Sequence, residues 1–154
     1  MQLNRNVDIS IYRFLTENLP AAIQVLDGYP TGYNGNPSTE LSLPTVAIVN
    51  SGVEFTPHQL GGGDLPSFIF IIDIYGRTKV QRGDIVYRIH EILDNRSFPI
   101  YDHSVSIPST DQIGHLILEG TVQSGPLYVF PKLNEKLFWA EELSFMGFYS
   151  PKAS

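Results

Sequence analysis

Residues 68–93 read FIFIIDIYGRTKVQRGDIVYRIHEIL and pass from an apolar run into an amphipathic one. The run from Phe68 to Ile72 contains no polar residue, and alternation begins only at Asp73. A short unbroken apolar run is typical of a strand that is covered on both faces. We therefore expect this strand at the centre of a sheet.

A helix is predicted after that strand, from Lys79 to Asp94. Thr78 and Gln81 have the spacing of a capping box, which satisfies backbone N–H groups at a helix start. The apolar residues behind them fall at i, i+4, i+7 and i+8: Ile85, Ile89, Ile92 and Leu93. This spacing places them on one side of a helix, so the helix should pack on the sheet.

Another helix is predicted near the N-terminus, from Val7 to Asn18. Its apolar stripe consists of Val7, Ile11, Phe14 and Leu15. Asn6 is a favourable N-cap, and Pro20 disfavours the α conformation of the residue before it, which ends the helix. Arg13 and Glu17 are expected to form an i, i+4 ion pair on the polar face.

Two long loops are predicted around a short strand. Residues 27–42 are rich in Gly, Pro, Asn, Ser and Thr without apolar periodicity, which is typical of an exposed loop. Thr45 to Val49 is β-branched and apolar and predicts a strand. The second loop is expected over residues 51–66. Loops of this length are generally functional or mobile.

The rest of the chain is predicted to be β-rich. Strands are expected over four segments separated by turn residues: 104–107, 113–123, 127–130 and 137–149. In the last strand one face carries Leu143, Phe145, Gly147 and Tyr149, and the other carries Ser144, Met146 and Phe148. Both faces have apolar content, so this strand is either covered on both sides or meets another subunit.

These elements predict one α+β domain, residues 1–154. The expected architecture is a mostly antiparallel β-sheet with two α-helices packed on one face. The β-rich C-terminal region, residues 127–149, is expected as an extension that adds a β-hairpin to this unit.

Composition excludes several classes of protein. The 154 residues include ten Lys+Arg against sixteen Asp+Glu, and the net charge of −6 is opposite to what counterion release on DNA requires. The absence of cysteine removes disulfides and thiolate metal sites. The sequence shows neither a secretory signal nor an apolar run long enough to span a bilayer. We expect a protein made in the cytoplasm without a membrane partner.

No residue pattern predicts catalysis, a metal or a cofactor. The histidines lack the spacing of a metal site, and hydrogen-bonded or solvated histidine is the default: His58, His90, His103 and His115. Glu141 and Glu142 are neighbours on a predicted strand, so they face opposite sides and cannot act together on one bond. No serine stands in a G-x-S-x-G turn. We therefore expect no enzymatic activity.

Two features are candidate interaction sites. Basic residues gather around the helix predicted over residues 79–94: Arg77, Lys79, Arg82 and Arg88. Acidic residues lie among them, and Asp84 is expected to pair with Arg88, so this side is either a solvated, salt-bridged face or a docking site for an acidic neighbouring subunit. The second feature is a glycine-rich loop that can rearrange in an assembly or remain a simple surface loop. It consists of Gly61, Gly62, Gly63 and Asp64.

Three segments resemble the tail terminator or tail completion proteins of long-tailed bacteriophages. They are IYRFLTENLP at residues 11–20, TVAIVNSG at residues 45–52 and the stretch at residues 68–93. The resemblance covers about residues 7–123. The long loop at residues 27–42 and the β-rich tail depart from small members of that family, which leaves a neck or sheath-associated relative open.

The resemblance implies a structural role in the virion, after assembly in the host cytoplasm. Members of the family form a ring, usually a hexamer, that caps the tail tube, stops its polymerisation and provides the surface on which the head docks. The implied partners are further copies of the chain, the tail tube protein, a head-completion or neck protein, and phage DNA that passes through the lumen without specific binding.

The site residues follow from that role as expectations. The four basic residues, Arg77, Lys79, Arg82 and Arg88, are expected at the subunit interface. The loop with Gly61, Gly62, Gly63 and Asp64 is expected to contact the tube or line the lumen. Two alternatives stay open: a head-completion adaptor or connector in the neck and, in another class, a small ligand-binding or enzymatic α+β domain.

Overall fold

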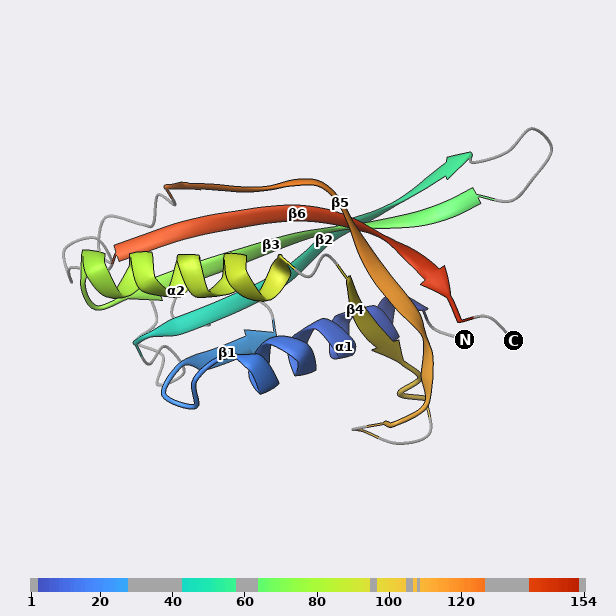
Figure 1. The fold of residues 1–154 in the computed structure, drawn as a ribbon, viewed down its shortest axis with the longest axis horizontal. Coiled ribbons are helices and arrows are strands. Elements are labelled where there is room, and N and C mark those ends of the chain that lie inside the picture. The colour runs from blue at the N-terminus through green and yellow to red at the C-terminus, as the bar shows by residue number, and fades with distance from the viewer. Residues whose placement is uncertain are drawn as a thin grey trace, which may run out of the picture.

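The computed structural model describes residues 3–27, 43–57, 64–94, 97–104, 107, 109–126 and 139–152 (Figure 1). Along the chain the elements are α1 (Leu3–Asn18), β1 (Gln24–Asp27), β2 (Thr45–Pro57), β3 (Asp64–Gly76), α2 (Lys79–Leu93), β4 (Ser97–Tyr101), β5 (Gln112–Pro126) and β6 (Trp139–Pro151). Two helices and a mostly antiparallel sheet confirm the predicted α+β fold.

The six strands form one curled sheet in the order β1-β2-β3-β6-β5-β4. The β1–β2 pair is parallel and the other four pairs are antiparallel. β3 lies between β2 and β6, which confirms the central position predicted for residues 68–72. β6 lies between β3 and β5, so the C-terminal strand is an interior strand of the sheet. The prediction that it belongs to an added hairpin region is wrong.

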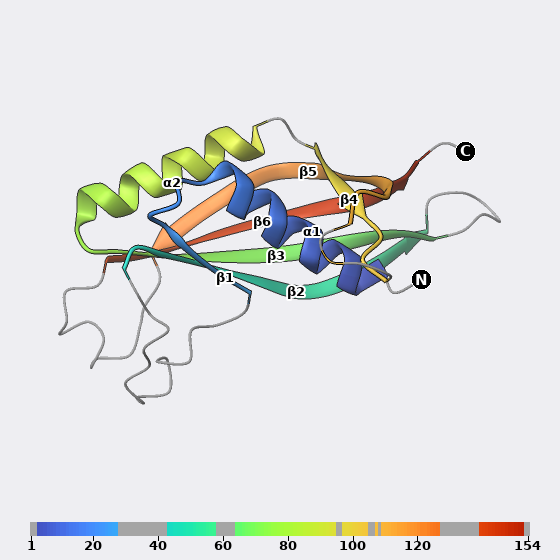
Figure 2. The same ribbon diagram turned by 90° about the horizontal axis from the view of Figure 1, so that it is seen from below.

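Both helices pack against the same face of the sheet and share one core (Figure 2). The buried helical residues are Val7, Ile11 and Leu15 of α1 and Ile85, Ile89 and Leu93 of α2. They meet residues of β3 that alternate along the strand, namely Phe68, Phe70, Ile72 and Ile74. Phe70 stacks on Phe145 of β6 with ring centroids 5.3 Å apart. The predicted apolar stripes of both helices are thereby confirmed.

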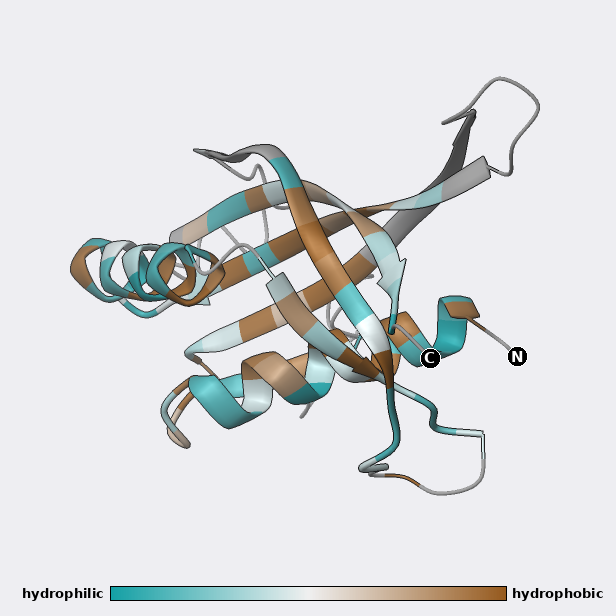
Figure 3. Ribbon diagram, turned by 45° about the vertical axis from the view of Figure 1, so that its right-hand side comes forward, coloured by the Kyte–Doolittle hydropathy of each residue, from teal (hydrophilic) through white to brown (hydrophobic). Residues whose placement is uncertain are grey.

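The second face of β3 is covered over only part of its length. Ile69 and Ile71, which point away from the helices, are half-buried, whereas Asp73 and Tyr75 on the same face are fully buried. The unbroken apolar run predicted that both faces of this strand are covered. That prediction is correct only for the C-terminal part of β3. Figure 3 shows how the apolar residues follow the strands beneath the helices.

The N-terminal helix begins earlier than its apolar stripe indicates. α1 starts at Leu3, so Asn6 lies inside the helix and is not its N-cap. The Asn6 side chain accepts a hydrogen bond from the backbone N–H of His103 at 2.9 Å. The end at Asn18 is confirmed, and so is the pair between Arg13 and Glu17, with Nε and Oε1 2.8 Å apart.

The start of α2 agrees with the capping pattern. Thr78 is the N-cap, and its Oγ1 accepts from the backbone N–H of Gln81 at 3.1 Å. The Gln81 side chain accepts in turn from the backbone N–H of Arg77 at 2.7 Å, one residue before the cap. The helix ends at Leu93 with Asp94 as C-cap.

Several strand boundaries differ from the predictions. β2 runs on to Pro57 and β3 begins at Asp64, so most of the loop predicted over residues 51–66 is strand. β1 and β4 were not predicted. Ser104 and Ile107 lie outside any strand, and residues 124–126, predicted as a turn, belong to β5. Residues 28–42 and the strand predicted at 127–130 lie outside the described residues.

Candidate functional site

The basic residues predicted at an interface do not share one surface. Lys79 is exposed at the start of α2. Arg77 precedes the helix, and its Nε donates to the backbone oxygen of Leu43 at 3.0 Å. Arg88 lies 3.8 Å from the carboxylate of Glu91, with both side chains about half exposed, and not in the predicted pair with Asp84.

Arg82 differs from the other three because it turns toward the sheet. Its Nε lies 3.7 Å from Oε2 of Glu141 in β6, and about one fifth of each side chain is exposed. Its backbone also packs closely on the end of β3, because a Cβ at Gly76 would lie 2.9 Å from the Arg82 nitrogen. Arg82 therefore belongs to the contact between α2 and the sheet, and its prediction on the exposed side of the helix is wrong.

The outer side of α2 carries an apolar surface that the sequence patterns did not single out. Val80 and Tyr87 are 72% and 67% exposed. They are seven residues apart, which is about two helical turns, so they lie on one side of the helix. Gly83 lies between them, and a Cβ added there would meet nothing within 4 Å. Figure 3 views α2 nearly end-on, with apolar residues on its outer side as well as toward the sheet. We call Val80, Gly83 and Tyr87 the outer face of α2.

β2 and β3 extend beyond the rest of the sheet as a two-stranded arm (Figure 1). The last pair between β3 and β6 is Ser67 with Phe148, whereas β2 and β3 continue to pair as far as Pro57 with Asp64. A two-stranded ribbon is only marginally stable by itself, so an arm of this kind gains from contact with a partner. Asp64 is the first residue of β3, and Gly61 to Gly63 lie outside the described residues.

A pair of carboxyl groups lies on the sheet face that points away from the helices. Asp73 of β3 stands opposite Glu142 of β6 in the strand register, and Asp73 is 1% exposed. Burial, then the neighbouring charge of Glu142 and a hydrogen bond with its carboxyl group, raise the pKa of Asp73 to about 7. The Asp73 carboxyl group can therefore take up a proton near neutral pH.

Glu141 and Glu142 face opposite sides of β6, which confirms the expectation for neighbours on a strand. Glu141 approaches Arg82 on the helix side, and Glu142 meets Asp73 on the other side. The partner of Glu142 was not predicted, because the sequence does not reveal that β6 inserts next to β3.

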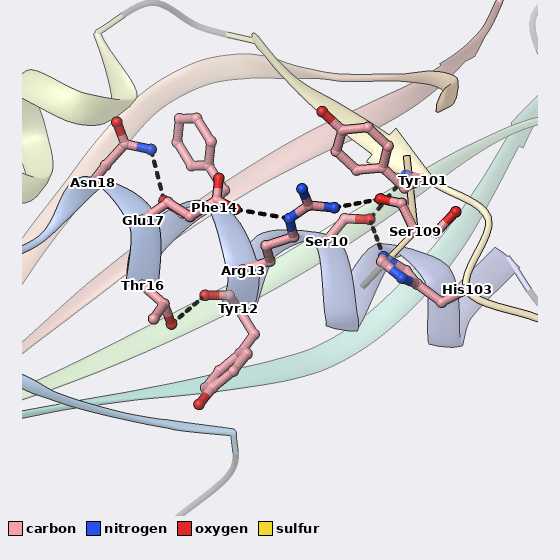
Figure 4. Close-up of polar contacts among 10 residues, drawn as sticks. All are labelled: Ser10, Tyr12, Arg13, Phe14, Thr16, Glu17, Asn18, Tyr101, His103 and Ser109. Atoms are coloured by element: carbon pink, nitrogen blue, oxygen red, sulfur yellow. Dashed lines mark hydrogen bonds and ion pairs between the residues drawn. The ribbon is translucent and has the colours of Figure 1, made fainter. Parts of the chain in front are cut away.

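A buried polar cluster joins α1 to β4 and the segment after it (Figure 4). Ser10 Oγ lies 3.3 Å from His103 Nε2 and accepts from the backbone N–H of Tyr101 at 3.0 Å. Ser10 and His103 are 2% and 1% exposed. This contact lies beneath α1 and out of reach of solvent, so we assign it a structural role. It also confirms that His103 is hydrogen-bonded, as expected by default.

Arg13 closes the exposed side of this cluster. Its guanidinium lies 4.7 Å from the ring centroid of Tyr101, which is a cation–π arrangement. Nη1 donates to the backbone oxygen of Ser109 (Figure 4). Together with Glu17, these contacts hold the chain that follows β4 against α1.

The described residues contain no group of three or more histidine, aspartate or glutamate side chains that could hold a metal ion. Neither described helix combines the length and the apolar character needed to cross a membrane. Comparison with protein-family models and with curated proteins finds no match to this chain. Among the described residues, the outer face of α2 and the arm formed by β2 and β3 are therefore the candidate interaction surfaces.

Proposed function

We propose that this chain is a structural subunit of a long-tailed bacteriophage and forms a ring that terminates the tail tube. The ring caps the tube, stops its polymerisation and offers a docking surface to the head or neck. The observation that carries the proposal is the outer face of α2. Val80 and Tyr87 remain exposed on a helix whose other apolar residues are buried in the core or pack against it, and exposed apolar surface supports an interaction site.

The resemblance to tail terminators agrees with the way the chain is built. Its three segments cover the second half of α1, the first part of β2, and most of β3 together with α2. Each of these segments contributes buried residues to the same core, so the similar segments are not scattered over the surface.

In this proposal the outer face of α2 provides one side of the subunit interface. Lys79 precedes Val80 and Arg88 follows Tyr87 along the helix, and both are exposed, so apolar contact and ion pairs to a neighbouring copy can form together. Arg82 is left out, because its charge already faces Glu141 of the same chain. A contact between two different patches on successive copies closes into a ring when the rotation between them allows it.

The arm formed by β2 and β3 is proposed to reach the tube or the lumen. Gly61, Gly62 and Gly63 precede Asp64, the first residue of β3, and these four residues stay the predicted contact. The net charge of −6 would favour the passage of DNA through the lumen, because an acidic wall repels the phosphate backbone.

Tube growth in the presence of the protein tests this function. Purified tail tube protein is polymerised alone and with the chain, and tube lengths are measured in negative-stain images. We expect short tubes that carry a ring at one end. Val80→Ser with Tyr87→Ser should restore long tubes, whereas Thr16→Ala, an exposed change on α1, should still shorten them. Unchanged tube lengths with the wild-type chain would contradict the proposal, and a ring that binds a head-completion protein while tubes keep growing would favour a neck adaptor.

A further inference from the structure

The carboxyl pair of Asp73 and Glu142 lies close to the end of the ladder between β3 and β6. Beyond this pair the two strands stay in register only as far as Gly76 of β3. On the other side of β6, the pairing with β5 is irregular between Glu119 and Gln123, so a short ladder holds the start of β6 to β5. The first residues of β6 can therefore move while the interior of the strand stays paired.

The residues beside the pair offer no compensating charge. Across the sheet, Ala47 of β2 stands next to Asp73, and Gly125 of β5 stands next to Glu142. Because side chains alternate between the two faces of a strand, the neighbours on the same face are two residues away along β3 and β6. These neighbours are uncharged near neutral pH, and they are Ile71, Tyr75, Ala140 and Ser144.

The charged groups of the other elements packed on this region face the opposite side of the sheet. Arg82 of α2 and Glu141 of β6 approach each other on the helix side. Asp27 of β1 is in register with Ile48, whose side chain belongs to the core on that same side. Neither α2 nor β1 therefore presents a described charge to the carboxyl pair.

The carboxyl group of Asp73 has no ion-pair partner in the described part of the chain. Arg77 follows the end of β3, but its side chain is exposed and donates to the backbone oxygen of Leu43 at 3.0 Å. Within the same described residues, Oδ1 of Asp73 is buried without a hydrogen-bond partner. A proton on Asp73 is therefore what removes its charge while the pair stays in place.

Ionisation of Asp73 is costly in this arrangement. A buried charge without a partner loses the stabilisation that water provides, and the charge of Glu142 adds repulsion between like charges. Both costs decrease when the first residues of β6 move away from β3, because the charge of Glu142 moves with them and water reaches Asp73. The protonated form favours the paired strands, and the ionised form favours their separation at this end.

The start of β6 is connected to the first turn of α2. Glu141 is the neighbour of Glu142, and its Oε2 lies 3.7 Å from Nε of Arg82. The backbone N–H of Arg82 donates to the oxygen of Thr78 at 3.0 Å, at the start of the helix. Gly76 at the end of β3 packs on that same backbone nitrogen. A movement of β6 at Glu142 therefore reaches α2 through one residue.

We infer that Asp73 and Glu142 form a proton-controlled switch where the end of β3, the start of β6 and the first turn of α2 meet. With Asp73 protonated, residues 139–142 stay paired with β3. With Asp73 ionised, residues 139–142 separate from β3 more readily, while the rest of the sheet stays folded. The inference concerns the single chain and does not rest on the proposed function.

Amide hydrogen exchange of the full chain tests this switch. Exchange at residues 139–142 and at the Arg82 amide is measured at pH 6 and pH 8 and corrected for the intrinsic pH dependence of exchange. The paired state binds a proton that the separated state releases, so we expect protection at these amides to fall about tenfold between pH 6 and pH 8. Asp73→Asn, which cannot ionise, should show no such fall.

Two neighbouring substitutions on β6 provide a matched comparison. Glu142→Gln removes the charge that faces Asp73 and should reduce the fall in protection. Glu141→Gln removes the adjacent charge on the opposite face of the strand and should leave the fall as large as in wild type. Equal effects of the two substitutions would overturn the inference.

Low concentrations of urea distinguish local separation from global unfolding. A local separation exposes little surface, so exchange at residues 139–142 at pH 8 should barely respond to urea. Exchange that accelerates with urea as steeply as at the core residues Ile11 and Ile100 would overturn the switch, and a pH-dependent global stability would remain. Equal protection of residues 139–142 at pH 6 and pH 8 in wild type would overturn the switch as well.

Discussion

Asp73 and Glu142 stand opposite each other in the register of β3 and β6, with Asp73 buried on the sheet face away from the helices. Two carboxyl groups at the centre of a sheet are unusual, because a buried charge costs free energy unless it is paired. Here the raised pKa of Asp73, about 7, lets a proton replace one of the charges. The stability of the central strand pair therefore depends on pH.

We expect the free energy of unfolding to fall as pH rises from about 4 to about 7. The ordinary pKa of Asp73 is 3.8 and its folded value is about 7, so in this window the folded chain binds more protons than the unfolded chain. Linkage then lowers the stability as pH rises through the folded pKa, and this group causes little further loss above about pH 8. Asp73→Asn, which keeps the shape and removes the charge, should be more stable than wild type at pH 8. Urea denaturation of both proteins at pH 5 and pH 8 measures their free energies of unfolding. An identical pH dependence for wild type and Asp73→Asn would contradict this prediction.

Arg82 and Arg88 are expected to respond differently to charge reversal. Arg82→Glu places a second carboxylate against the partly buried Glu141 and should reduce the free energy of unfolding by about 1–3 kcal/mol. Adding Glu141→Arg should restore part of the loss. Arg88→Glu on the exposed side should change stability by less than about 0.5 kcal/mol. Urea denaturation of the three variants checks this, and an Arg82→Glu variant as stable as wild type would rule out the contact.

Asn6→Ala is expected to loosen α1 from β4. The change removes the acceptor for the buried backbone N–H of His103. Loss of a buried hydrogen-bond partner costs about 1–3 kcal/mol. The control is Asn18→Ala, whose exposed side chain donates to the backbone of its own helix at Phe14. Thermal unfolding should show a clear decrease in Tm for Asn6→Ala alone. Equal decreases in Tm for both variants would mean that the buried cluster adds nothing to the stability of the protein.

Gly83→Ala and Gly114→Ala are expected to act in opposite directions. A Cβ at Gly83 meets nothing within 4 Å, so alanine should stabilise α2 by up to about 1 kcal/mol. A Cβ at Gly114 would lie 2.3 Å from the backbone oxygen of Ser150, so β5 and β6 would have to separate there. The Tm should therefore rise for the first variant and fall for the second. A stable Gly114→Ala protein would contradict the close approach of these two strands.

The elements with strong local signals were predictable from the sequence. The apolar stripes and the Thr78 cap specify the two helices, and the unbroken run at residues 68–72 specifies the centre of the sheet. The alternation in β6 correctly places Leu143 and Phe145 on one face of the strand, which is the face buried in the core. In each case the information lies within one segment, because helix and strand periodicity are local properties of the chain.

The features that were not predictable from the sequence depend on contacts between distant segments. β1 and β4 are short, and Pro99 lowers the β propensity of β4, which tolerates it as an edge strand. Asn6 lies inside a helix because its side chain finds partners almost a hundred residues away. Asp73 meets Glu142 only because β6 inserts next to β3. In the sequence, Val80 and Tyr87 lie outside the apolar stripe of α2. Only the fold shows that these two side chains are exposed.

Ring formation is the central claim, and the mass of the purified chain in solution tests it most directly. Light scattering over a range of concentrations, with and without tail tube protein, gives that mass against the 17.2 kDa of one chain. We expect a single multiple of the chain mass that matches rings in negative-stain images, formed by the chain alone or on addition of tube protein. A mass that stays at 17.2 kDa under all of these conditions would contradict the claim.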